Sequence, residues 1–199
     1  MTANHLTEDI LSFERRSGRY EHSLSQFFVF DRVHKAALDL IPQGLNPVNI
    51  LDIGCGTGRL LRKAADRWPR ASLTGVDPAE GMITEAHCLT PDAKFLVSTA
   101  EDISLPANAF DLVVSTMSFH HWADQRRALQ QIADILVCGG YFLLADQVPP
   151  YGLDRIIHHG RPADFPQRRA LFEPAGLQVR VEKKIMAGFV LITLARMNR

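Results

Sequence analysis

Three glycines alternate with other residues directly after a carboxylate, within residues 51–58. The glycines are Gly54, Gly56 and Gly58, and the carboxylate is Asp52. A Cβ at such positions would block either a tight turn or a ligand that lies against the backbone, so loops of this kind usually hold a nucleotide-like molecule. A carboxylate would repel a pyrophosphate, whereas it would attract an ammonium or a sulfonium group. The loop therefore indicates a site for a cationic nucleoside that carries no phosphate.

The spacing of the glycines disfavours two common nucleotide sites. A dinucleotide-binding loop has the pattern Gly-x-Gly-x-x-Gly, but here the third glycine comes one residue early. A phosphate-binding loop continues with Gly-Lys-Ser or Gly-Lys-Thr, whereas Arg59 and Leu60 follow the last glycine here. S-adenosylmethionine is a nucleoside that is cationic at its sulfonium and carries no phosphate, so it fits the site that the loop indicates.

Five segments resemble, in the same order, the motifs of class I S-adenosylmethionine-dependent methyltransferases. The likeness is greatest to the ubiquinone/menaquinone-biosynthesis-type branch, which acts on small molecules. The segments are 51–58 (Leu-Asp-Ile-Gly-Cys-Gly-Thr-Gly), 75–78 (Gly-Val-Asp-Pro), 100–102 (Ala-Glu-Asp), 110–114 (Phe-Asp-Leu-Val-Val) and 139–141 (Gly-Gly-Tyr). The resemblance implies methyl transfer from S-adenosyl-L-methionine to O, N, S or C of a small-molecule acceptor. The transfer would be an in-line displacement that leaves S-adenosyl-L-homocysteine as the product.

Two other hypotheses stay open on the sequence alone. A non-catalytic S-adenosylmethionine-binding protein or partner subunit is favoured by Thr99, an unusual residue for its position, and by the short insert 147–164, which leaves little wall for an acceptor pocket. A nucleotide-dependent oxidoreductase is the third hypothesis, and the glycine spacing disfavours it.

Asp77 follows the second apolar run, at the strand end where doubly wound sheets bind their ligands. The resemblance implies that its carboxylate accepts both ribose hydroxyls of the cofactor. The alternative is an acid that caps the helix beginning at Pro78. We interpret Cys55 as a small packing residue, and Met82 either covers the adenine or packs in the core. The cofactor-binding residues that the resemblance implies are Asp52, Gly54, Cys55, Gly56, Thr57, Gly58, Asp77, Pro78, Met82, Thr99, Ala100, Glu101, Thr116 and Met117.

Thr99 departs from the pattern of the family, which usually has an acid immediately before the Ala-Glu pair to accept from the adenine amino group. A threonine hydroxyl accepts a hydrogen bond without the help of a charge. Glu101 or Asp102 could compensate. The residue that reads the adenine is therefore open at this point.

Thr116, Met117 and Ser118 end the fourth expected strand, where the resemblance places the reacting methyl group. Methyltransferases that act on nucleic-acid bases carry Asn/Asp-Pro-Pro-Tyr/Phe here, so the sequence disfavours base methylation. The acidic metal ligands of catechol-type enzymes are also missing, and we expect no metal. His120 and His121 follow, and an imidazole with a near-neutral pKa can take a proton from a hydroxyl or a thiol.

The two histidines nevertheless have a second interpretation. In the branch that the chain resembles, one histidine at this turn often supports the loop, so a structural role and base catalysis both stay open for His120 and His121. His158 and His159, in the insert, are alternative bases or part of a solvated loop. Arg16 and Tyr20 resemble, by position only, an N-terminal pair that closes over the cofactor.

The overall composition narrows the classes of partner. The formal net charge is zero with no basic stripe, which disfavours a nucleic-acid surface. The three cysteines are odd in number and widely spaced, which indicates a reducing, cytoplasmic compartment. We expect neither a signal peptide nor a membrane span, and either a monomer or a homodimer.

Apolar runs alternate with helical patterns from residue 48 onward, which is typical of a parallel α/β sheet. The expected fold is a three-layer, doubly wound, mostly parallel seven-stranded sheet of the Rossmann-like methyltransferase type, ending in an antiparallel hairpin. The expected helices are 58–68, 78–88, 124–137 (stopped by Gly139 and Gly140) and 167–175, and the expected strands are 49–53, 72–76, 94–97, 110–116, 141–145, 178–185 and 189–195.

The chain divides, on this pattern, into an N-terminal helical cap (residues 1–45) and a methyltransferase domain (residues 46–199). Apolar residues in the cap recur at helical spacing, at Phe30, Val33, Ala37, Leu40 and Ile41. The cap is either a helix packed on the sheet or a lid over the acceptor.

Overall fold

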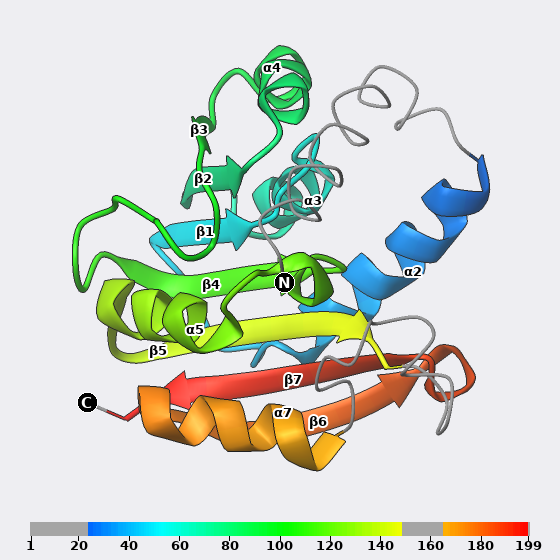
Figure 1. Ribbon diagram of the computed structural model, residues 1–199. Coiled ribbons are helices and arrows are strands. Elements are labelled where there is room, and N and C mark those ends of the chain that lie inside the picture. Colours follow the sequence, from blue (N-terminus) through cyan, green and yellow to red (C-terminus); the bar gives the residue numbers. More distant parts are fainter. Residues whose placement is uncertain (1–23, 149–164, 199) are drawn as a thin grey trace.

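The computed structural model describes residues 24–148 and 165–198, with side chains from residue 28 and from residue 169 in the two ranges (Figure 1). One seven-stranded sheet runs through this part of the chain, in the order β3-β2-β1-β4-β5-β7-β6. The strands are β1 (Asn49–Ile53), β2 (Ser72–Asp77), β3 (Lys94–Val97), β4 (Phe110–Thr116), β5 (Leu136–Gln147), β6 (Leu177–Ile185) and β7 (Val190–Met197). β1 to β5 pair in parallel, and β7 is antiparallel to both β5 and β6. The expected fold class is confirmed.

The helices cover both faces of the sheet because neighbouring strand residues point to opposite faces. Leu112 belongs to a core cluster with α2 (Leu24–Leu40), α3 (Arg59–Arg67) and α4 (Glu80–Leu89), whereas Val113 belongs to a second cluster with α5 (Gln125–Ile135) and α7 (Phe165–Phe172). In Figure 1 the helix α5 lies over β4 and β5, and α7 lies over the C-terminal hairpin. The sheet is therefore buried on both faces along most of its width.

The helix expected at 124–137 ends at Ile135, and β5 begins at the next residue. The sequence prediction was wrong here, because Gly139 and Gly140 lie inside β5 and do not stop the helix. Gly139 has a φ of +74°, and the register between β4 and β5 shifts between Phe110 and Leu112. The two glycines thus shape an irregular first part of the strand, so β5 begins five residues before the expected 141–145.

Other boundaries of the expected elements moved by a turn or less. The expected helix 78–88 begins at Glu80, and the helix expected at 58–68 occupies Arg59–Arg67. The segment expected as helix 167–175 consists of α7 and a 3₁₀ turn, η2 (Glu173–Ala175). The predicted hairpin is confirmed, since β6 and β7 are joined by the short turn η3 (Met186–Gly188).

Helix α2 packs against the same sheet face as α3. Val33, Ala37 and Ile41 of the expected stripe are buried, and Asp31 lies 2.5 Å from the ammonium of Lys63 on α3. The described part of the expected cap is thus a helix anchored to the sheet, and its division from the rest of the chain stays a prediction. Within the described ranges, each helix is too short or too polar to cross a membrane.

Candidate functional site

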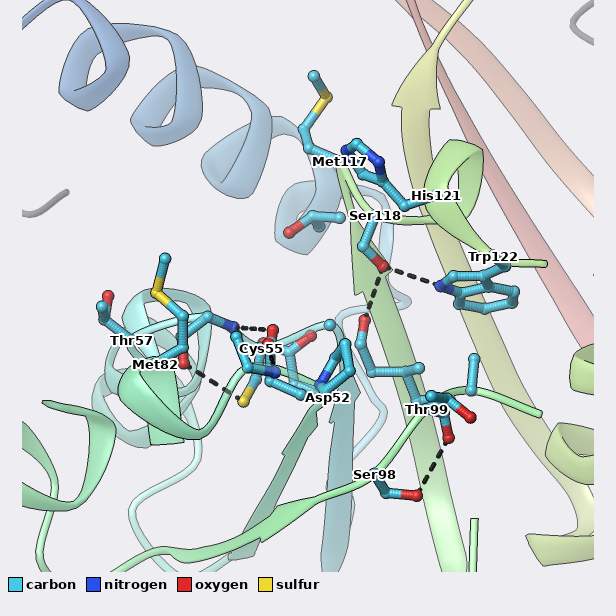
Figure 2. Close-up of a pocket in the computed structure, with 18 of the residues that line it drawn as sticks. Asp52, Cys55, Thr57, Met82, Ser98, Thr99, Met117, Ser118, His121 and Trp122 are labelled. Atoms are coloured by element: carbon cyan, nitrogen blue, oxygen red, sulfur yellow. Dashed lines mark hydrogen bonds between the residues drawn. The ribbon is translucent and has the colours of Figure 1, made fainter. Parts of the chain in front are cut away.

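A pocket opens at the carboxyl ends of β1, β2 and β4, and helix α2 closes one side of it. Figure 2 shows Cys55, Thr57 and Met82 on one side of this pocket and Met117, Ser118 and His121 on the other. The sequence-predicted residues that line it are Asp52, Gly54, Cys55, Gly56, Thr57, Asp77, Pro78, Met82, Thr99, Ala100, Glu101, Thr116, Met117 and His121. Gly58 and His120, the remaining two, are not among its lining residues.

The glycine loop wraps around the end of β2. The backbone N–H groups of Gly54 and Cys55 donate to the carbonyl of Val76 at 2.8 and 3.0 Å. Gly54 has a φ of +71°, and a Cβ there would lie 2.2 Å from the Oγ of Ser118. Gly58 also has a positive φ, and a Cβ there would lie 3.1 Å from the ring of Phe95. Two of the three glycines are therefore required by packing within the protein.

Gly56 differs from the other two glycines of the loop. Its φ is +52°, yet an added Cβ would meet nothing within 4 Å. Its N–H donates to the Oδ2 of Asp77 at 2.9 Å. The left-handed backbone at this position favours glycine and aims the N–H of Gly56 at the carboxylate of Asp77. The absence of a side chain leaves open space on the pocket side.

Asp52 is a buried carboxyl in the wall of the pocket. Asp52 is only 1 % exposed, and its Oδ1 has no hydrogen-bond partner among the residues that the structure describes. Burial, and secondarily the charge of Asp77, raise the pKa of Asp52 to about 8. A buried oxygen without a partner is costly, and a cationic ligand group would satisfy it.

Asp77 anchors the backbone at the end of β2. Its two oxygens accept from the N–H groups of Gly56 and Ala79, both at 2.9 Å. Burial raises its pKa, and these two hydrogen bonds partly offset that rise. Each oxygen keeps a further lone pair, so an anchoring role before α4 and a contact to a ligand are compatible.

Cys55 and Met82 are both buried beside the loop. The pKa of the Cys55 thiol is raised well above its usual value, first of all by burial, and the sulfur lies so close to Gly75 that a Cβ there would be 2.8 Å away. Such a thiol is a poor nucleophile, in agreement with a packing role. Met82 is buried and also lines the pocket, so its two interpretations are compatible.

The segment after β3 holds the residues that were expected near the adenine. Thr99 and Glu101 line the pocket, and a Glu101 oxygen accepts the N–H of Asp124 at 3.0 Å, at the start of α5. Asp102 is not among the lining residues and forms an ion pair with Arg127 on the surface. Of the two acids that could compensate for Thr99, Glu101 is therefore the one in the pocket.

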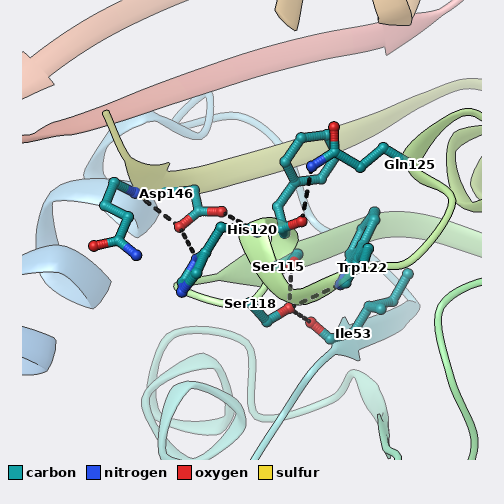
Figure 3. Close-up of polar contacts among 9 residues, drawn as sticks. Ile53, Ser115, Ser118, His120, Trp122, Gln125 and Asp146 are labelled. Atoms are coloured by element: carbon teal, nitrogen blue, oxygen red, sulfur yellow. Dashed lines mark hydrogen bonds and ion pairs between the residues drawn. The ribbon is translucent and has the colours of Figure 1, made fainter. Parts of the chain in front are cut away.

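The loop after β4 is held by two polar clusters (Figure 3). Ser118 Oγ accepts from the indole of Trp122 at 3.1 Å and donates to the carbonyl of Ile53 at 3.2 Å. Asp146, which is fully buried, accepts from both the backbone N–H and the Nδ1 of His120 at 2.8 Å. The structure thus separates the histidine pair, because His120 supports the loop while His121 lines the pocket.

Ser118 lines the pocket as expected, and seven further lining residues were not expected there: Phe30, His34, Ile53, Arg59, Ala79, Ser98 and Trp122. His34, on α2, is 5 % exposed and its Nε2 lies 3.1 Å from the Oγ1 of Thr116. Burial, and then the charges of Lys63 and Arg59, lower the pKa of His34 to about 3. His34 lies one turn after Phe30, at the edge of the apolar stripe, and that spacing is the only sequence signal for it.

Arg16, Tyr20, His158 and His159 lie outside the described residues. Among the residues that are described, the histidine, cysteine and acidic side chains form no group of three or more that could hold a metal ion.

Known proteins resemble this chain over the segment that contains most of the pocket residues. A family model described as a methyltransferase domain matches residues 51–144. A malonyl-[acyl-carrier protein] O-methyltransferase of Geobacter sulfurreducens is 35% identical over 138 residues, which are 67% of this chain and 51% of that protein. A demethylmenaquinone methyltransferase of Thermotoga maritima is 26% identical over 140 residues, 69% of this chain and 61% of that protein. The chain thus spans between half and two thirds of the length of these relatives.

Solved structures show the same fold. The putative methyltransferase in a complex with the Haloferax volcanii Trm112 methyltransferase activator superposes with a TM-score of 0.82 at 21% identity, covering 94% of this chain and 98% of that one. A putative S-adenosylmethionine-dependent methyltransferase from Listeria monocytogenes gives a TM-score of 0.70 at 19% identity, covering 84% and 98%. The curated relatives described above bear the names of enzymes.

Proposed function

We propose that this chain, which belongs to the class I S-adenosylmethionine-dependent methyltransferases, transfers the sulfonium methyl group to a small-molecule acceptor. The observation that carries the proposal is one pocket lined by the glycine loop and by two carboxyls, buried Asp52 and half-buried Asp77. S-adenosyl-L-methionine is cationic at its sulfonium and amino groups and carries no phosphate. The charge and the shape of the wall therefore suit that cofactor.

The residues present fit the cofactor at two points. The free Oδ1 of Asp52 is placed to accept from a cationic group in the pocket, and the remaining lone pairs of Asp77 are placed to accept from ribose hydroxyls. The open space beside Gly56 leaves room for a ligand against the backbone. Thr57, Pro78, Met82, Thr99, Ala100 and Glu101 supply further wall, and we propose them as cofactor contacts.

The chemistry demands little of the side chains. The bound cofactor supplies a methyl group that is already activated by the sulfonium. The protein has to align the acceptor, the methyl carbon and the sulfur, and to exclude water. Thr116 and Met117, at the end of β4, and His121, in the next turn, line the pocket on the side away from the glycine loop. If the acceptor must lose a proton, we propose His121 rather than His120 as the base, since Asp146 holds His120 in the loop.

The small-molecule nature of the acceptor rests on several observations. The names of relatives specify malonyl-[acyl-carrier protein], demethylmenaquinone and trans-aconitate as their substrates. The formal net charge of zero, without a basic stripe in the sequence, disfavours a nucleic acid as the acceptor. We propose a cytoplasmic enzyme that needs no metal and works as a monomer or a homodimer.

The test is calorimetric titration of the purified chain with S-adenosylmethionine, S-adenosylhomocysteine and, as a control, NAD. We expect micromolar affinity for both adenosyl ligands and none for NAD. Binding would be followed by a screen of acceptors with a labelled methyl donor. Absence of binding by both adenosyl ligands would reject the proposal, and binding of NAD alone would favour an oxidoreductase.

A further inference from the structure

A hydrogen-bonded pair, His34 and Thr116, joins helix α2 to the end of β4 inside the pocket. The Nε2 of His34 lies 3.1 Å from the Oγ1 of Thr116, although the two residues are 82 positions apart in the chain. His34 Nδ1 is buried and has no hydrogen-bond partner among the described residues. A buried ring nitrogen without a partner in a ligand pocket is an unused recognition group.

The electrostatic surroundings of His34 are positive. Arg59 lines the same pocket, and its charge acts on His34 together with those of Lys63 and Arg62, while Asp31 opposes them. Burial and these cations keep the imidazole neutral at physiological pH, since its pKa falls to about 3. His34 therefore cannot serve as the general base for an acceptor, but it can donate or accept a hydrogen bond.

The two ends of the pocket thus differ in charge. The carboxyls of Asp52 and Asp77 lie at the glycine loop, where they suit the cationic cofactor, whereas Arg59 and neutral His34 lie toward α2. If the Thr116 hydroxyl donates to Nε2, the proton of the neutral imidazole is on Nδ1, which then becomes a donor in the pocket. A hydrogen-bond donor and an arginine whose charge reaches it, in the wall of the same pocket, are a combination that selects an anion.

We infer that His34 and Arg59 form an acceptor subsite for a carboxylate, with Thr116 fixing the tautomer of His34. This inference rests on the proposed function and specifies its acceptor. A carboxylate oxygen would form the new bond to the methyl carbon with its lone pair, while the carbon–sulfur bond breaks and its electron pair stays on sulfur. The product is a methyl ester, and no proton has to move, which agrees with a neutral His34.

The experiment measures binding of two matched probes, benzoate and benzamide, to the protein saturated with S-adenosylhomocysteine. We expect benzoate to bind at least about tenfold more tightly than benzamide, a ratio that one charge-assisted contact supplies. In His34→Phe and in Arg59→Gln the ratio should fall below about threefold, while the affinity for S-adenosylhomocysteine stays within about twofold. Two variants keep the test decisive if one of them does not fold.

Matched controls separate the subsite from general effects. Lys35→Gln removes a charge from the exposed face of α2, next to His34, and should leave the ratio unchanged. Thr116→Val should lower the ratio and shift the ¹⁵N signals of His34 toward the other tautomer, whereas Thr193→Val, at a buried threonine of β7, should do neither.

Each contrary outcome has a distinct meaning. Equal binding of the two probes, or no binding of either, with a normal affinity for S-adenosylhomocysteine would overturn the carboxylate subsite and leave the methyltransferase proposal standing. A tenfold loss of S-adenosylhomocysteine affinity in Arg59→Gln would overturn it as well, because the anion held there would be the carboxylate of the cofactor. Failure of the wild-type protein to bind S-adenosylhomocysteine would reject both proposals.

Discussion

The pocket has two walls, and their residues come together over very different distances along the chain. The glycine-loop wall consists of residues 52–57 and Asp77, and its Gly56–Asp77 hydrogen bond joins positions 21 apart. The α2 wall consists of Phe30, His34, Thr116 and Met117, and its His34–Thr116 contact joins positions 82 apart. The first wall has a local backbone shape that demands particular residues, whereas the second depends on how a helix docks on the sheet.

The largest loss of stability is expected for a substitution where the glycine-loop wall packs on the loop after β4. Gly54→Ala would put a Cβ 2.2 Å from Ser118 Oγ, at a φ of +71°. Overpacking and backbone strain together should lower the free energy of unfolding by about 2–5 kcal/mol. Gly44→Ala is the control, since a Cβ there meets nothing within 4 Å. Urea unfolding of both variants measures the difference, and equal stabilities would mean that the glycine loop and the loop after β4 are not packed together as described.

The next effect concerns ligand binding at the glycine-loop wall. Asp77→Ala should weaken binding of S-adenosylmethionine at least about tenfold, because a charge-assisted hydrogen bond contributes roughly 1.5–3 kcal/mol. Asp111→Ala is a matched control at the other end of the sheet, where that carboxylate accepts the N–H groups of Val48 and Asn49 at 2.9 and 2.8 Å. Both variants should lose stability in urea, but calorimetry should show a loss of affinity in Asp77→Ala alone.

The same contrast explains what the sequence could predict. The strand 49–53, the glycine loop and Asp77 follow local rules of turn geometry and apolar runs, and the structure has them where they were expected. The ends of α5 and β5 were misplaced because Gly139 and Gly140 serve a shifted strand register, which depends on pairing with β4. In the sequence, a glycine pair that follows a helical pattern looks the same whether it stops the helix or lies in a strand with a shifted register.

The α2 wall could not be predicted for a related reason. His34 belongs to the site because helix α2 docks on the sheet, where the Nε2 of His34 forms a hydrogen bond with the hydroxyl of Thr116, a residue far along the chain. The histidine pair that the sequence did single out is divided by a partner, Asp146, that no local pattern connects with His120. Long-range side-chain contacts of this kind carry no periodic signal.

A smaller and pH-dependent effect is expected at Asp52, the buried acid of the glycine-loop wall. Its pKa is raised to about 8 in the folded protein, so it binds a proton more tightly there than in the unfolded chain. Its contribution to stability is therefore lost as the pH rises from about 4 to about 8, and it is constant at higher pH. Asp52→Asn should be more stable than the wild type by an amount that grows between pH 5 and pH 8.

The measurement is urea unfolding of Asp52→Asn and the wild type at several pH values, with calorimetry of S-adenosylmethionine alongside. We expect the stability gain of Asp52→Asn to accompany a weaker affinity for the cofactor, since an amide at this position cannot ionise beside a cationic ligand group. A difference in stability that does not vary with pH would show that the pKa of Asp52 is not raised and that Asp52 is ionised in the free protein at neutral pH.

The smallest effect is expected at Asp102, which the sequence offered as a possible reader of the adenine. Its side chain is 66% exposed and pairs with Arg127, itself 59% exposed, and it does not line the pocket. Exposed ion pairs contribute about 0–1 kcal/mol, so Asp102→Ala should change the free energy of unfolding by no more than that. Calorimetry should find its affinity for S-adenosylmethionine within about twofold of the wild type. Glu101→Gln is the informative partner variant, because that acid does line the pocket, and a loss of affinity in Asp102→Ala but not in Glu101→Gln would reverse the assignment.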